Sequence, residues 1–401
     1  MKKGTTNQSI AGKTKAGDLF EKIWLQSAKN SSIISKDLAR KAFVDCADNQ
    51  SLSLLETFSQ QPYKPALYSF SEKNNKEYNE ENIQSKLVST NNVKDAVYRG
   101  AFEDLKQTYQ ALCTSLYQKA VKESFSVEAL IPFFYPPSGY AVFRGGEELE
   151  LEKEVGTAAI YPIILGVMQH QKIIVHDRVN ASVSTVDIDC KEGSTLNLIY
   201  SVHSANLNSI HFQISCAKNA TVQITVLTTG VERQNITYSA SVIGEGGHVG
   251  VDIRAGASAS QKVSIDGVIY HKAQNTTSDQ TIKNIGAEAS ASSFDGTIYI
   301  HSNAKHSNAY QKATNLLIGK RAKAIAKPKL EIFTDDVKAS HGSTTSYLDK
   351  DVMQYFASRG LATPQAMKLI LKGFLCGGLD ALPQTIVDQI ESYVKRVRYE
   401  V

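Results

Sequence analysis

The chain has 401 residues and a formal net charge of +4 at pH 7. This length exceeds one average domain and predicts a folded protein with more than one part. Lys and Arg residues are scattered along the sequence, so the charge pattern shows no footprint for nucleic acid or a membrane surface.

The sequence predicts neither a membrane span nor an export signal. Its longest nearly apolar run, Ala158–Met168, falls well short of the roughly 20 residues that a membrane helix needs. The first residues lack the charged, apolar and small-residue order of a signal peptide. We therefore expect a cytoplasmic protein.

The five cysteines are widely spaced and form no C-x-x-C pair. They are Cys46, Cys113, Cys190, Cys216 and Cys376. This pattern disfavours a disulfide scaffold and a self-contained zinc or iron–sulfur site. Each cysteine is expected to be a small buried hydrophobe.

The N-terminal part is predicted to be a mobile tail followed by helices. Residues 1–17 are polar and small, with no periodicity that could bury surface. Residues 18–146 show a helical spacing of apolar side chains, as at Leu19, Phe20, Ile23 and Trp24. Prolines and glycines in 131–146 end this pattern.

A phosphate-binding loop is not predicted in the tail. Gly12, Lys13 and Thr14 match the end of that motif, but Asn7 stands where it needs a glycine. The motif also requires a preceding strand. We expect no nucleotide on this chain.

Residues 147–345 are predicted to be a β-solenoid. Short runs of alternating apolar and polar residues indicate half-buried strands. These runs are 195–200, 221–227, 249–253, 263–269, 297–300 and 330–333. Turn segments such as AKNAT at 217 and GEGGH at 244 recur at intervals of about 17 to 30 residues, as in stacked coils. This favours a solenoid over a sandwich, with the flanking helical regions capping its ends.

Residues 346–401 are predicted to form a small helical domain. Asp349 is a candidate N-cap for a helix over 351–359, with Gly360 after its end. Thr363 and Pro364 are expected to cap and open a second helix that ends at Cys376. A third helix carries one apolar face, made of Ile386, Val387, Ile390, Val394 and Val397. The apolar surface of these helices exceeds what the solenoid needs and can bind a partner.

The candidate site lies at the join of solenoid and helices, in LEIFTDDVKASHGST from Leu330. The His341 imidazole is a good ligand for iron, although one ligand cannot complete a cluster site. Asp335 and Asp336 can supply oxygen ligands or orient the imidazole. The alternatives are a hydrogen-bonded turn histidine and aspartates that form the turn and pair with Lys338.

The remaining histidines are expected to be structural or exposed. They include His248, His271, His301 and His306, which fall at predicted corners or strand ends. His301 and His306 could also meet on adjacent turns.

The segments that carry this chemistry resemble the SufB and SufD family of iron–sulfur cluster assembly proteins. The resembling stretches are HKAQNTTSDQTIKN from His271, the run from Ser292, the join from Ala326, and LEIFTDDVKASHGSTTSYLDKDVMQYFASRG. The D-D-V-K-x-S-H-G-x-T form is similar to that of SufD. The family often has cysteine two residues before this histidine, where this chain has Ala339.

The resemblance implies a right-handed parallel β-helix flanked by N-terminal and C-terminal α-helical regions. It implies a scaffold subunit, not an enzyme, that pairs with a SufB-like subunit and docks SufC-type ABC ATPases through its C-terminal helices. A transient iron–sulfur cluster or iron would be handled at the subunit interface, with His341 as the ligand from this chain. Pairing of the chain with itself remains open.

Two other classes of protein are alternatives. A carbohydrate-active β-solenoid enzyme would need facing carboxylates at a defined separation, whereas Asp335 and Asp336 are neighbours, which on a strand point to opposite sides. An adhesin-like surface solenoid would need an export signal.

Overall fold

A computed structural model of the chain defines residues 68–70, 96–100, 140–144, 148–153, 158–167, 169–177, 181–203, 205–379 and 382–398. The expected tail at 1–17 lies outside these residues. So does the expected helical region at 18–146, apart from three short strands.

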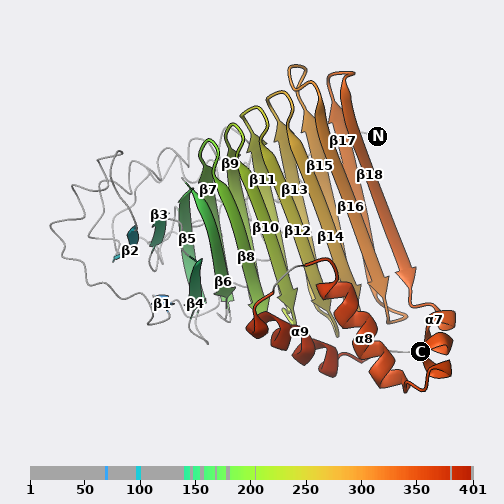
Figure 1. Cartoon of the computed structure of the whole chain (residues 1–401). Helices are drawn as coiled ribbons and strands as arrows, with labels where there is room; N and C mark the ends of the chain where they lie inside the picture. Colours follow the sequence, from blue (N-terminus) through green and yellow to red (C-terminus); the bar gives the residue numbers. More distant parts are fainter. Residues whose placement is uncertain are drawn as a thin grey trace, which may run out of the picture.

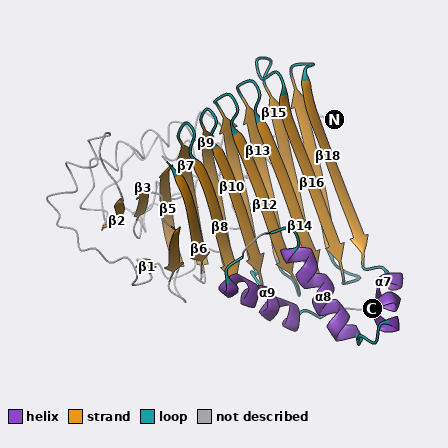
Figure 2. Cartoon of the chain, viewed as in Figure 1, coloured by secondary structure: helices purple, strands orange, loops and turns teal. Residues whose placement is uncertain are grey.

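Within the described residues, the chain forms strands followed by C-terminal helices (Figure 2). The strands are β1 (Tyr68–Phe70), β2 (Ala96–Gly100), β3 (Tyr140–Arg144), β4 (Glu148–Lys153), β5 (Ala158–Val167), β6 (His170–Asp177), β7 (Ala181–Cys190), β8 (Thr195–His203), β9 (Leu207–Cys216), β10 (Thr221–Thr229), β11 (Arg233–Val242), β12 (His248–Ala257), β13 (Lys262–His271), β14 (Thr277–Gly286), β15 (Ala291–Ile300), β16 (Ser307–Leu317), β17 (Lys323–Ile332) and β18 (Val337–Tyr347). The helices are α7 (Lys350–Ser358), α8 (Thr363–Cys376) and α9 (Gln384–Arg396).

The strands form two nine-stranded sheets, and from β3 onward successive strands alternate between them, as Figure 1 shows. Sheet A runs from β2 through β3 and the later odd-numbered strands to β17, and sheet B runs from β1 through the even-numbered strands from β4 to β18. From β3 and β4 onward, each strand pairs in parallel with the strand two places later. The predicted parallel β-helix is confirmed, and its handedness stays a prediction. β3 already belongs to it, a few residues before the expected boundary at 147.

Each coil consists of one strand from each sheet and two corners. Thr195 pairs with Thr221, and Thr277 pairs with Asn308, so a coil takes 26 residues in the middle of the stack and 31 toward its end. All six predicted strand runs lie in strands, apart from Phe333, which directly follows β17. Corners hold a residue with positive φ, for example Gly246 at +70° and His306 at +59°, a conformation that favours glycine and that histidine tolerates better than most.

Alternate side chains of each strand point into the solenoid and form rows that cross the sheet. Leu198, Ile224 and Val251 are consecutive partners in one row of sheet B, and each is at most 2% exposed. Full burial of such a side chain contributes about 1.5–3 kcal/mol. Stacked apolar rows of this kind therefore hold the middle coils together.

The C-terminal helices begin and end close to their predicted positions. The side chain of Asp349 accepts a hydrogen bond from the Asp351 N–H at the start of α7, and Gly360 has φ +79° after its end. One detail was wrong, because the N-cap of α8 is Ala362 instead of Thr363. Gln365 accepts from the Ala362 N–H and satisfies the backbone there.

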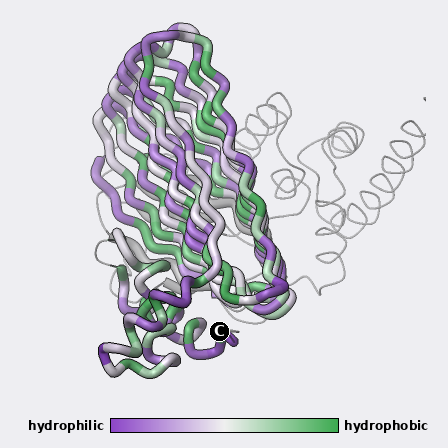
Figure 3. The backbone as a smooth tube through the Cα atoms, turned by 90° about the vertical axis from the view of Figure 1, so that its right-hand side faces the viewer, coloured by the Kyte–Doolittle hydropathy of each residue, from purple (hydrophilic) through white to green (hydrophobic). Residues whose placement is uncertain are grey.

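The expectation that the C-terminal helices cap the end of the solenoid was wrong. Helices α8 and α9 pack on the outer face of sheet B, against Ile199, Leu227 and Ile285. Tyr393 of α9 reaches across and donates to the Ala257 carbonyl oxygen. Figure 3, in which the last coil faces the viewer, shows these helices below the coil and no described element over it.

Candidate functional site

The last coil, made of β17 and β18, is the open end of the solenoid. β17 and β18 each stand at one end of their sheet, so each has one backbone edge without a neighbouring strand among the described residues. Most side chains of β18 are exposed, whereas β16 alternates buried and exposed ones. Edges of this length are normally covered or paired, because they are templates for another chain.

His341 lies in the middle of β18, on the row that points into the solenoid. Its partner in β16 is Gln311, which in turn pairs with Gln280 of β14 and then with Val251. The same row is apolar in earlier coils and becomes polar at Gln280. Gln280 and Gln311 are 1% and 2% exposed, whereas His341 is exposed because no further coil covers it.

A second inward row of sheet B shows the same change from apolar to polar. Ala255, Asn284, Asn315 and Thr345 are consecutive partners across sheet B. Asn284 donates to Asn315 Oδ1 at 3.0 Å, and Asn315 donates to Thr345 Oγ1 at 3.1 Å. Two inward rows of sheet B therefore become polar toward the open end, whereas the row of Ile282 and Ala313 between them stays apolar.

Asp335 and Asp336 lie in the corner between β17 and β18, away from His341. Four residues of extended strand, about 13 Å, separate Val337 from His341. Asp336 Oδ2 lies 3.0 Å from Nδ1 of His306, and its carbonyl oxygen accepts from the His306 N–H at 2.6 Å. The partner of Asp336 is thus His306 of the preceding corner and not Lys338.

His248, His271, His301 and His306 contact hydroxyls, rings or a carboxylate. His248 hydrogen-bonds to Thr277, and His301 stacks on the Tyr299 ring at 4.8 Å. His301 and His306 belong to the same corner, and each has its own partner. The fully buried His271 hydrogen-bonds to Thr276 and to Ser278. These contacts favour the structural interpretation for these four residues.

Of the three thiols described by the structure, two are buried as expected, whereas Cys376 of α8 is only partly buried. Cys190 and Cys216 are buried register partners in sheet A. Burial, with the neighbouring Cys190, raises the pKa of Cys216 to about 12, so this thiol stays protonated. Ala339 and His341 are two residues apart on β18, so both lie on the face that points into the solenoid. Ala339 packs against the buried cluster of Ile298 and Ile300. A cysteine at 339 would have placed a thiolate beside His341.

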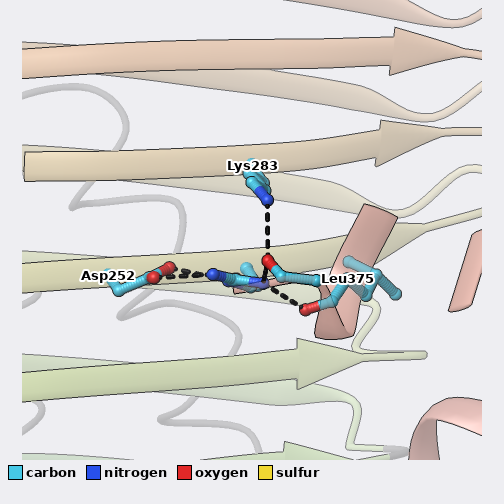
Figure 4. A network of polar contacts seen from close by, with 5 residues as sticks. Asp252, Lys283 and Leu375 are labelled. Atoms are coloured by element: carbon cyan, nitrogen blue, oxygen red, sulfur yellow. Dashed lines mark hydrogen bonds and ion pairs between the residues drawn. The ribbon is translucent and has the colours of Figure 1, made fainter. Parts of the chain in front are cut away.

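A buried arginine joins the solenoid to the helices, as Figure 4 shows. Arg254 is 3% exposed and donates twice to Asp252, at 2.8 Å each. Its Nη1 also donates to the carbonyl oxygens of Leu375 and Gly377 at the end of α8. Lys283 donates to the same Gly377 carbonyl at 3.1 Å. Cations at a helix C-terminus satisfy its free carbonyls and oppose its dipole.

Two features fall outside what sequence patterns revealed. The pairing of Gln280 with Gln311 depends on strand register, and the contact of Arg254 with α8 joins distant segments. Among the described residues, no three His, Cys, Asp or Glu side chains are grouped to bind a metal ion. Nor does any described helix combine the length and apolarity needed to cross a membrane.

Comparison with known proteins identifies the family. Residues 162–374 match the model of the SufBD core domain of the SUF system for FeS cluster assembly, which is more than half of the chain. The matched region extends from β5 through the solenoid to α8. The chain therefore belongs to the SufBD family of iron–sulfur cluster assembly proteins.

Within the family the chain is close to SufD. It is 34% identical over 114 residues to the iron–sulfur cluster assembly protein SufD of Escherichia coli, covering 28% of this chain and 27% of that protein. It is 31% identical over 110 residues to SufD of Bacillus subtilis, covering 27% and 25%. The chloroplastic protein ABCI7 of Arabidopsis thaliana is 36% identical over 103 residues, covering 25% and 22%. The alignments thus span about a quarter of each relative.

Proposed function

We propose that this chain is a SufD-like scaffold subunit that pairs through its last coil with a SufB-like subunit. The observation that carries the proposal is that both sheets end at the same coil, with His341 on its inward row. A partner strand at each open edge would continue both ladders and remove the exposed backbone groups. The pair would then enclose what is now the open end.

An exposed aromatic stripe supports the same contact surface. On the outer face of sheet A, the rings of Tyr270 and Tyr299 lie 5.6 Å apart, and those of Tyr299 and Phe333 lie 4.9 Å apart. Phe333, at the open end, is 56% exposed. Large aromatic side chains of this kind are enriched in protein interfaces. A docked partner would cover Phe333 together with the edge of β17.

In this proposal His341 binds iron or a nascent cluster that the assembly builds as its product. One imidazole supplies one ligand, so the partner must supply the remaining ones. Asp335 and Asp336 contribute to iron handling as exposed carboxylates at the corner of the same coil, too far from the imidazole to orient it. No observation favours the carbohydrate-active alternative, since these two carboxylates share one turn.

The C-terminal helices dock the SufC-type ATPase in this proposal. Val352 and Tyr355 on α7 and Leu369 on α8 are between 39% and 57% exposed. These side chains are not used to hold the helices on sheet B, which is done by the buried side chains of α8 and α9. They are available to a partner of apolar character.

The test is anaerobic reconstitution of the complex after co-expression with a SufB-like subunit and a SufC-type ATPase. His341→Ala is expected to keep the complex intact and to lower the recovered iron and sulfide several-fold. His170→Ala, an exposed histidine on β6, is the control and should recover wild-type amounts. Unchanged iron and sulfide with His341→Ala would remove the proposed role of this residue. A chain that pairs only with itself would contradict the SufB-like partner.

A further inference from the structure

Two glutamines and a tyrosine form a buried polar ladder inside the solenoid. Tyr238 Oη donates to Gln280 Oε1 at 2.6 Å, and Gln311 Nε2 donates to the same oxygen at 3.0 Å. All three side chains are at most 3% exposed. Buried polar groups cost free energy unless they are hydrogen-bonded. Apolar side chains would avoid this cost at the same positions, so the ladder is not explained by stability alone.

Two glycines of sheet A make room for this ladder. A Cβ added at Gly267 would overlap the ring of Tyr238, and one added at Gly296 would overlap Gln311 Nε2 and the Phe294 ring. These two glycines are register partners in sheet A, so sheet A provides the space for the glutamine side chains of sheet B. It places the amide of Gln311 one strand away from the open end.

The ladder stops one step short of His341. Gln311 Oε1 is buried and has no hydrogen-bond partner, a state that costs about 1–3 kcal/mol. Its register partner in the next strand is His341, and adjacent strands lie about 4.8 Å apart. Four residues further on, Asn315 and Thr345 of the same two strands already hydrogen-bond through their side chains. The strand spacing therefore suits a direct contact at Gln311.

We propose that Gln311 is a positioning residue that accepts a hydrogen bond from a ring N–H of His341. Gln311 Nε2 already donates to Gln280 Oε1, and the atom left without a partner is the acceptor Gln311 Oε1. The ring nitrogen that faces this oxygen must therefore carry the proton. The other ring nitrogen of the neutral imidazole then keeps its lone pair, directed away from Gln311 for a ligand. The contribution of this hydrogen bond to iron binding rests on the proposed function, whereas the existence of the hydrogen bond does not.

The test is nuclear magnetic resonance of the full chain with ring-¹⁵N-labelled histidine at pH 8, where a neutral imidazole predominates. The His341 signals are assigned by their loss in His341→Asn. Wild type is expected to show one dominant tautomer, and Gln311→Met a mixture of both. Gln311→Leu is a second variant without an acceptor, with an apolar side chain as at Val251 in the same row.

Asn315→Leu is the matched control, because it breaks the neighbouring ladder and leaves Gln311 in place. It should retain the wild-type tautomer. Equal tautomer populations in wild type and in both folded Gln311 variants would overturn the positioning role. If His341→Ala leaves cluster recovery intact while Gln311→Met still changes the tautomer, the proposed function fails and the hydrogen bond stands.

Discussion

Arg254 and Leu375 are 121 positions apart in the sequence, and a 2.8 Å hydrogen bond from Nη1 of Arg254 to the Leu375 carbonyl oxygen joins β12 to α8. The same guanidinium forms the buried pair with Asp252. One side chain thus links the solenoid to the helical domain. This arrangement makes Arg254 the residue whose loss should separate the two parts.

Arg254→Met is expected to loosen the helices from sheet B. Removing one member of a buried ion pair costs about 3–5 kcal/mol, because the remaining charge is unpaired. Hydrogen exchange should accelerate in α8 and α9 and stay slow in β8 to β10. Lys329→Met is the control, since its pair with Asp295 is exposed and such pairs contribute about 0–1 kcal/mol. Unchanged exchange in α8 would show that the apolar contacts alone hold the helices.

Substitution of the exposed apolar side chains should abolish ATPase docking without unfolding the helices. Leu369→Glu with Tyr355→Ala is expected to weaken co-purification of a SufC-type ATPase at least tenfold, since two apolar contacts are lost. Lys395→Ala, at an exposed position of α9, should leave docking normal. Deletion of residues 346–401 should abolish docking altogether. Normal docking by that truncated chain would show that the ATPase binds elsewhere.

Acid should destabilise the solenoid through its buried histidines. Burial, with the nearby His248, lowers the pKa of His271 to about 4, and burial also lowers that of His211 to about 4. An unfolded histidine titrates near 6.5, so below that pH the unfolded state binds protons first. Stability is therefore fully present above about pH 6.5 and falls by about 1.4 kcal/mol per pH unit and histidine, down to pH 4.

The measurement is the urea midpoint at pH 7 and at pH 5. His271→Gln should lower the midpoint at pH 7, because the contacts of the imidazole with Thr276 and Ser278 are lost. It should also reduce the difference between the two pH values. His170→Gln, on an exposed residue, should leave that difference unchanged. An undiminished difference in His271→Gln would mean that other groups cause the acid sensitivity.

Gly267→Ala tests the space that the polar ladder needs. The added methyl group would meet the ring of Tyr238, and overpacking of a core typically costs about 1–3 kcal/mol. Thermal unfolding should show a lower midpoint. Gly342→Ala is the matched control in β18, where a Cβ meets no atom within 4 Å. Equal midpoints for the two variants would contradict the close packing inside the coils.

Much of the solenoid could be predicted because its signals are local. Strands such as β10 alternate apolar and polar residues, and turns such as Gly244 to Gly247 coincide with clusters of glycine and other small residues. The caps at Asp349 and Gly360 are equally local, and both were confirmed. In each case the structure is determined by residues that are close together in the sequence, so a local sequence pattern can predict it.

The candidate site was predictable only in part. The sequence motif around His341 identifies it as a candidate ligand. The residues that share its row could not be predicted, because they depend on which residue of β16 is its register partner. Gln280 and Gln311 are 31 residues apart, Gln311 and His341 are 30 apart, and an earlier coil takes 26 residues. No fixed period along the chain therefore identifies the row. The pairing of Asp336 with His306 and the position of the helices on sheet B likewise depend on contacts between segments that are far apart in the sequence.

The open end also has a consequence for the order in which the molecule comes apart. In a stack where each repeat is stabilised by its neighbours, a terminal repeat with one neighbour is the least stable. Local fraying should therefore begin at β17 and β18 and displace His341 while Tyr238 and Gln280 are still packed. A docked partner would act as the missing neighbour. The imidazole would then be held in a fixed geometry only in an assembled complex, which couples loading of the site to the presence of its other subunit.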